Sequence, residues 1–120
     1  MNKVQALTSF WNGFGLKAYD ETSVPDTAVL PYITFEVGTS DFDRDVALTG
    51  SLWYRDTSWA AITAKEMEIA NHIGRGGLIK AYDGGALWIR RGTPWAQRMS
   101  DATDDSVRRV VLNVEIEFID

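Results

Sequence analysis

Few side chains of this sequence could carry out a reaction, and none stands in the pattern that a known reaction requires. The single histidine, His72, falls on the polar face of a predicted helix near its C-terminal end, where a positive charge is favoured. No motif places a nucleophile and an orienting carboxylate around it. The glycines of residues 74–77 follow this helix, whereas phosphate-binding glycine loops follow a strand and open a helix. We therefore expect a surface histidine and a helix stop.

A run of acidic residues is the first candidate for metal binding. Asp41, Asp43 and Asp45 have the Asp-x-Asp-x-Asp spacing that opens a calcium loop. That loop also needs a glycine at its sixth position and a glutamate at its twelfth, and the sequence has Val46 and Leu52 there. The run is therefore interpreted as a solvated acidic loop that faces a basic partner or a DNA channel, without a metal.

Glu66 is the remaining candidate for catalysis, because it falls in the middle of the apolar stripe of a predicted helix. A charge in that position needs a partner. The arginines available for a salt bridge are Arg55, Arg90, Arg91 and Arg108. No second acid can be placed beside Glu66, so a salt bridge within or between subunits is the preferred interpretation. A small hydrolase or transferase built around Glu66 is the alternative.

The composition excludes several classes of protein. There is no cysteine, so disulfides, thiol catalysis and thiolate metal sites are excluded. The net charge is −5 and no run of Lys and Arg exceeds two residues, which argues against specific nucleic-acid binding. No apolar run approaches the roughly 18 residues that would cross a bilayer. We expect neither a cofactor nor a membrane.

The spacing of apolar residues predicts one α+β domain over residues 1–120. Helical periodicity covers residues 3–12 and 59–73. Alternation with a period of two predicts strands over residues 32–37, 47–55, 79–82, 86–90 and 107–119, with a short extended piece at 16–19. Residues 92–105 are polar and are predicted to form a loop. The expected fold is a mostly antiparallel or mixed sheet of four to five strands, with both helices packed on one face.

Two tryptophans indicate a surface for protein assembly. Trp53 lies on the opposite strand face from its apolar neighbours, so both faces of that strand need a cover. Trp95 lies with Arg98 and Met99 in the predicted polar loop, where it either folds back onto its own sheet or meets another subunit. Because Trp, Met and Arg are enriched in interfaces, Trp53, Trp95, Arg98 and Met99 are the predicted interface residues.

Four short segments follow one another along the chain: Ser23-Val24-Pro25, Leu30-Pro31-Tyr32-Ile33-Thr34-Phe35, Ser51-Leu52-Trp53-Tyr54-Arg55 and Ser58-Trp59. The glycines of residues 74–77 and the last strand follow them in register. In this order the segments resemble the tail-terminator, or tail-completion, proteins of long-tailed bacteriophages, including the lambda-type terminator, and the resemblance covers most of the chain.

The resemblance implies a virion protein that is assembled in the host cytoplasm and has neither enzymatic activity nor a cofactor. It implies a homo-oligomeric ring, generally hexameric, at the head-proximal end of the tail tube. Such a ring ends tube polymerisation, joins the tail to the head connector and lets DNA pass without specific binding. Asp41, Asp43 and Asp45 would then line the lumen or pair with arginines between subunits. The alternative is another neck, head–tail joining or minor tail subunit.

Overall fold

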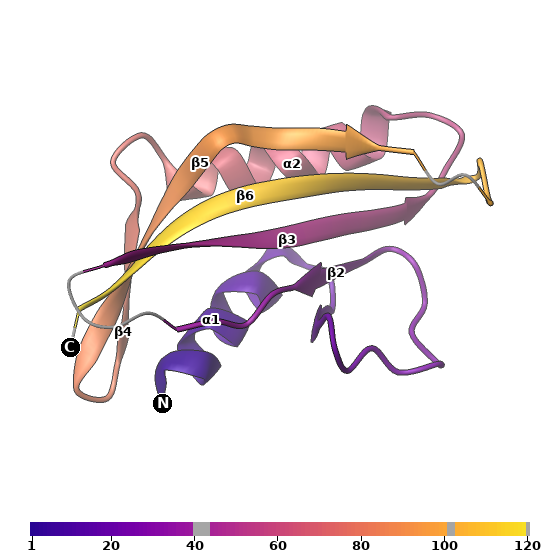
Figure 1. The fold of residues 1–120 in the computed structure, drawn as a ribbon. Helices are drawn as coiled ribbons and strands as arrows, with labels where there is room; N and C mark the ends of the chain where they lie inside the picture. Colours follow the sequence, from indigo (N-terminus) through magenta and orange to yellow (C-terminus); the bar gives the residue numbers. More distant parts are fainter. Residues whose placement is uncertain (40–43, 101–102, 120) are drawn as a thin grey trace.

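The computed structural model describes residues 1–39, 44–100 and 103–119 (Figure 1). The elements follow the order α1 (Lys3–Trp11), η1 (Asn12–Phe14), β1 (Ala18–Asp20), β2 (Tyr32–Phe35), β3 (Asp45–Arg55), α2 (Ala60–Ile73), β4 (Leu78–Tyr82), β5 (Gly85–Met99) and β6 (Val107–Ile119). Both predicted helices are present, within a residue of their expected bounds.

Helix α1 begins where a capping box satisfies its first free amides. The side chain of Asn2 accepts a hydrogen bond from the backbone N–H of Gln5, and the side chain of Gln5 accepts one from the N–H of Asn2. One face of the helix then buries Leu7, Phe10 and Trp11. This local start fixes which face of α1 meets the sheet.

Helix α2 begins at Ala60, one residue later than predicted. The hydroxyl of Ser58 accepts from the N–H of Ala60 at 3.0 Å, so this side chain satisfies one of the free amides of the first turn. Gly74 ends the helix with φ 75°, a conformation that favours glycine, and its N–H bonds the carbonyl of Ala70. The expected glycine stop is thus confirmed.

The sheet has six strands in the order β1-β2-β3-β6-β5-β4, more than the four to five predicted. The additional strand is β1, which the sequence indicated only as a short extended piece. It pairs in parallel with β2, and the other neighbours are antiparallel. Strands β3 and β6 stay in register from Asp45↔Glu117 to Arg55↔Val107. They form the long centre of the sheet, visible across Figure 1.

The prediction of a loop over residues 92–105 is wrong for residues 92–99, because β5 continues to Met99. The pairing of β5 with β6 shifts between Arg91, opposite Val114, and Ala96, opposite Leu112. Residues 92–95 therefore form a wide bulge opposite a single residue of β6. A glycine and a proline inside this bulge gave the segment the appearance of a loop.

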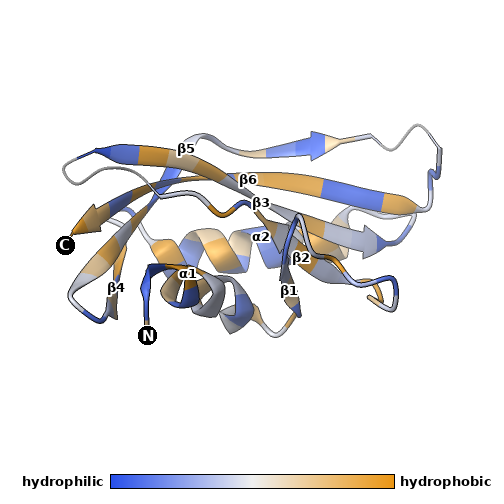
Figure 2. Ribbon diagram, turned by 60° about the horizontal axis from the view of Figure 1, so that its bottom comes forward, coloured by the Kyte–Doolittle hydropathy of each residue, from blue (hydrophilic) through white to orange (hydrophobic). Residues whose placement is uncertain are grey.

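Both helices pack on one face of the sheet, as predicted, and Figure 2 shows them together below it. Their apolar faces and the inner face of the strands form one core, in which Leu7, Ile62 and Leu112 are at most 1% exposed. The side chain of Trp11 in α1 reaches Gly50 of β3. A Cβ placed there would lie 2.4 Å from the ring of Trp11, so the ring rests directly on the backbone of the strand.

Candidate functional site

The face of the sheet that points away from the helices is not covered by another described helix or strand (Figure 2). Side chains alternate along a strand. The even-numbered residues of β3 and β6, such as Leu52 and Leu112, lie in the core. The odd-numbered residues of both strands, such as Trp53 and Arg109, therefore lie on the uncovered face.

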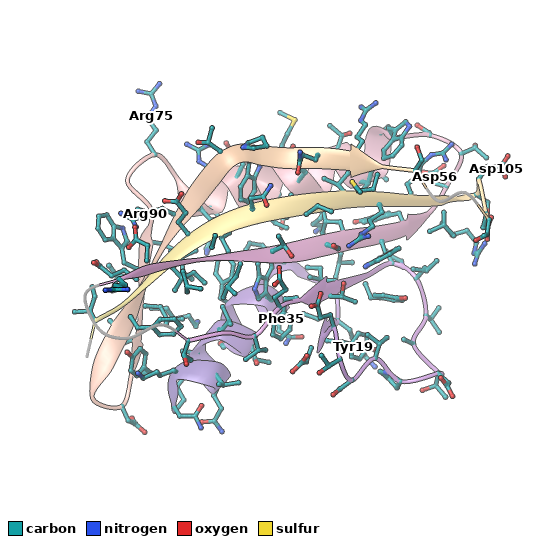
Figure 3. The ribbon with its side chains drawn as sticks, viewed as in Figure 1. Tyr19, Phe35, Asp56, Arg75, Arg90 and Asp105 are labelled. Atoms are coloured by element: carbon teal, nitrogen blue, oxygen red, sulfur yellow. The ribbon has the colours of Figure 1, made fainter. Side chains whose placement is uncertain are left out.

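Four residues of this face form one row across the sheet, which we call the Trp53 row. Strand pairing places Tyr32 opposite Trp53, Trp53 opposite Arg109, and Arg109 opposite Met99. The ring of Tyr19 extends the row beyond β2, 5.7 Å from the ring of Tyr32 (Figure 3). The row thus joins two predicted interface residues, Trp53 and Met99, which are far apart in the sequence.

A cation–π contact and hydrogen bonds hold the side chains of the Trp53 row in place. The guanidinium of Arg109 lies 4.6 Å from the centre of the Trp53 ring, a cation–π geometry. Its Nε and Nη2 donate to the Ser51 hydroxyl at 3.2 and 3.1 Å, and Trp53 Nε1 donates to Thr34 Oγ1 at 2.9 Å. A pre-ordered surface of aromatic rings, Arg and Met has the composition of the centre of a protein interface.

Trp95 packs within its own subunit. It leaves the bulge of β5 towards the helices, packs against the core, and donates from Nε1 to Glu66 Oε1 of α2 at 2.6 Å. Of the two arrangements expected for Trp95, the structure has the one in which it folds back. The side chain that Glu66 contacts here is therefore the indole of Trp95 and not one of the expected arginines.

Arg98 also points away from the Trp53 row. Its guanidinium lies 4.7 Å from the centre of the Trp59 ring, and that of Arg108 lies 5.1 Å from the same ring. Arg108 further donates to the carbonyls of Thr57 and Asp105. These contacts fasten the ends of β5 and β6 to the start of α2, so Trp95 and Arg98 are separated from Trp53 and Met99 by the sheet.

The predicted acidic loop is described only in part. Asp41 and Asp43 lie outside the described residues. Asp45 is not in a loop but is the first residue of β3, and it forms an ion pair with Arg90 Nη2 at 2.5 Å (Figure 3). Glu115 and Glu117 of β6 are the cross-strand neighbours of Arg90 and Asp45. The uncovered face is therefore acidic at the end opposite to the Trp53 row.

His72 is exposed, as expected, and lies against the ring of Phe14 at a centroid distance of 5.3 Å. It borders a surface cavity of about 460 Å³ between α1, the end of α2 and β4. The cavity is lined by Ser9, Phe10, Gly13, His72, Leu78, Ile79 and Lys80. No carboxylate is among these lining residues, so the acid that would orient His72 for catalysis is missing there.

The shifted pKa values have local structural causes. Burial raises the pKa of Tyr54, and the nearby Glu68 carboxylate raises it further. Hydrogen bonds from Thr22 lower the pKa of Asp20, and hydrogen bonds from Ser106 lower that of Asp104. Asp20 and Asp104 accept hydrogen bonds within turns, and Tyr54 is packed beside α2. The three pKa shifts therefore do not mark a reactive site.

In the described part of the chain, no group of three or more His, Asp or Glu residues is placed to hold a metal ion. None of the helices in that part has the length and apolar character needed to cross a membrane.

Several residues of the uncovered face were missed in the sequence. Arg109 and Tyr32 each lie in a segment of alternating apolar and polar residues. The alternation predicts a strand for each segment, but it does not predict that the two residues share one row of the sheet. The registers between β2, β3, β6 and β5 bring them together, and a single sequence does not reveal those registers.

The arrangement defines a small α+β domain with a curled mixed sheet, helices on one face and a pre-ordered aromatic row on the other. No protein-family model matches this chain. No curated protein matches it either. A solved structure that it resembles is a chain described as "Virion of native gene transfer agent (GTA) particle". The identity is 14% and the TM-score 0.62, over 95% of this chain and 84% of the other. At this identity the likeness shows a shared fold.

Proposed function

We propose that this chain is a structural protein of a phage or phage-like particle and that it works by assembling with other subunits. The fold shared with a chain of a gene transfer agent virion over 95% of the present chain is the observation that carries the proposal. The pre-ordered Trp53 row supports it, because it offers an interface on a face that the fold itself leaves open.

Within that class, we propose a tail-terminator role. The subunits form a ring, generally hexameric, at the head-proximal end of the tail tube, end its polymerisation and present a surface to the head connector. The Trp53 row is the surface that meets a partner protein of the particle. The acidic residues Asp45, Glu115 and Glu117 suit a wall that DNA passes without binding, because they repel phosphate.

Capping of purified tail tubes tests this role. Tubes grown from their subunits in the presence of the chain are expected to stop at a fixed length, with a ring at one end in electron micrographs. Trp53→Ala is expected to reduce capping, since removal of an interface centre costs about 2 kcal/mol or more. Met67→Ala is the matched control, because Met67 is 56% exposed on α2 and away from the row.

Two results would count against the proposal. Tubes that grow without limit in excess chain would exclude the terminator role. Growth of the chain itself into long tubes would support the alternative, another structural subunit of the tail or neck. A catalytic role built on Glu66 would require activity that is lost in Glu66→Gln.

A further inference from the structure

A loop with an exposed apolar side chain projects from one end of the molecule. Residues 21–30 connect β1 to β2 and extend away from the sheet at the lower right of Figure 1. Val29 in this loop is 79% exposed. Apart from Val29, the loop carries the acidic residues Glu21 and Asp26. It therefore presents an exposed apolar side chain on a segment with negative charge.

Hydrogen bonds at the start of this loop and just before Val29 order its backbone. Asp20 Oδ1 accepts from the N–H and the hydroxyl of Thr22 at 3.0 and 2.8 Å. The N–H of Ala28 donates to the carbonyl of Pro25 at 3.0 Å, which closes a turn next to Val29. A segment that is ordered before it binds loses less entropy on binding.

A cavity of matching character lies against β4, the strand at the other end of the molecule. It is the cavity of about 460 Å³ between α1 and β4 described above, and Phe10, Leu78 and Ile79 supply its apolar lining. Ile79 is 61% exposed at this edge of the sheet. The polar part of the lining includes Lys80 and His72, and no lining residue carries a negative charge. Arg75 lies at the same end of the molecule (Figure 3).

We infer that the loop of residues 21–30 of one copy of this chain inserts Val29 into the α1–β4 cavity of the next copy. The inference rests on the proposed ring. A ring needs two different patches that complement each other, placed so that each copy uses one patch for either neighbour. The loop lies at the opposite end of the molecule from β4 (Figure 1), the strand that supplies Leu78, Ile79 and Lys80 to the cavity, and an acidic loop with an exposed valine complements an apolar cavity that contains Lys80.

Cross-linking tests this contact directly, because the sequence has no cysteine and so gives no background. Val29→Cys combined with Ile79→Cys in one chain, treated with a short bismaleimide, is expected to give a ladder of dimers, trimers and larger closed species. Each single variant is expected to remain uncross-linked, since the contact joins unlike patches. Val29→Cys with Met67→Cys is the matched control, since Met67 is exposed on neither patch.

A ladder in the double variant that exceeds the control supports the inference. A ladder equal to that of the control overturns it. Because the cross-link is measured without tail tubes, it can form even if the chain fails to cap tubes, which would reject the terminator role alone. Capping without a specific ladder would instead reject this contact and leave the terminator role standing.

Charge placed at position 29 provides an independent measurement. Val29→Lys is expected to lower the apparent association constant between copies at least about tenfold in sedimentation or native mass spectrometry, because an ammonium group would enter an apolar cavity that already contains Lys80. An association constant equal to that of wild type would overturn the inference. Since Val29 is exposed, the circular dichroism spectrum is expected to stay that of wild type.

Discussion

At the scale of single residues, a few close contacts decide how the helices and strands meet. The ring of Trp11 rests on the backbone of Gly50, where a Cβ would come within 2.4 Å. Trp11 itself is 1% exposed and stacks near Phe35 at a centroid distance of 6.3 Å. A ring enclosed in this way cannot move aside without disturbing the core.

Gly50→Ala is therefore expected to lower the free energy of unfolding by about 1–3 kcal/mol, through overpacking against Trp11. Urea denaturation followed by fluorescence measures this loss. Gly13→Ala is the control, because a Cβ at Gly13 meets nothing within 4 Å. Equal stabilities of the two variants would show that Trp11 can shift to make room.

At the scale of the elements, the long strand β5 was the main error of the sequence analysis. Alternation in residues 86–90 correctly predicted its first part. The bulge at residues 92–95 then interrupts the period of two, and it contains Gly92 and Pro94, which are rare in strand interiors. The strand resumes at Ala96 because the neighbouring strand β6 continues past the bulge and supplies the hydrogen-bonding partner. A local pattern cannot report pairing that a distant segment provides.

Apart from the short strand β1, the other elements were predictable because each carried its own local signal. Helix α2 has an apolar stripe, a serine at its start and a glycine at its end. Strand β6 alternates over its whole length. The partners of Glu66 and Arg109 were not predictable, since a side chain selects its partner only after helix and strand have packed. Trp53 was singled out by its residue type and its strand face, and Met99 by its residue type. The contact of each with a partner protein stays a prediction.

Glu66 and Trp95 connect α2 to the bulge of β5, and this connection can be measured. Glu66→Ala leaves Trp95 Nε1 without its acceptor in a partly buried position, so we expect a loss of about 1–3 kcal/mol in the free energy of unfolding. Glu66→Gln keeps an acceptor and is expected to lose less. A double-mutant cycle with Trp95→Phe isolates the contact, and a coupling energy of zero would contradict this assignment.

At the scale of the whole molecule, one hydrophobic core connects both helices to the strands of the sheet. The buried residues of α1, α2 and the central strands belong to a single cluster. Strand β6 lies between β3 and β5, so its inner side chains contact both halves of the domain. A chain with a single core of this kind is expected to unfold in one cooperative step.

Leu112→Ala tests this unity, because Leu112 is 0% exposed at the centre of the sheet. The loss of unfolding free energy is expected to be about 2–5 kcal/mol, with one shared midpoint in fluorescence and circular dichroism. Ile79→Ala, at an exposed position of an edge strand, is expected to change stability by at most about 0.5 kcal/mol. Two separate transitions in Leu112→Ala would mean that the halves of the sheet unfold independently.

The unbroken pairing of β3 with β6 also has a mechanical consequence. The two strands are antiparallel and remain in register from Asp45 to Arg55, with hydrogen bonds perpendicular to the strand axis. A force that pulls the strands along that axis in opposite directions loads all of these bonds in shear, so they must break together. A force applied across the sheet would open them one after another. The domain is therefore expected to be stiffest along the axis of these two strands.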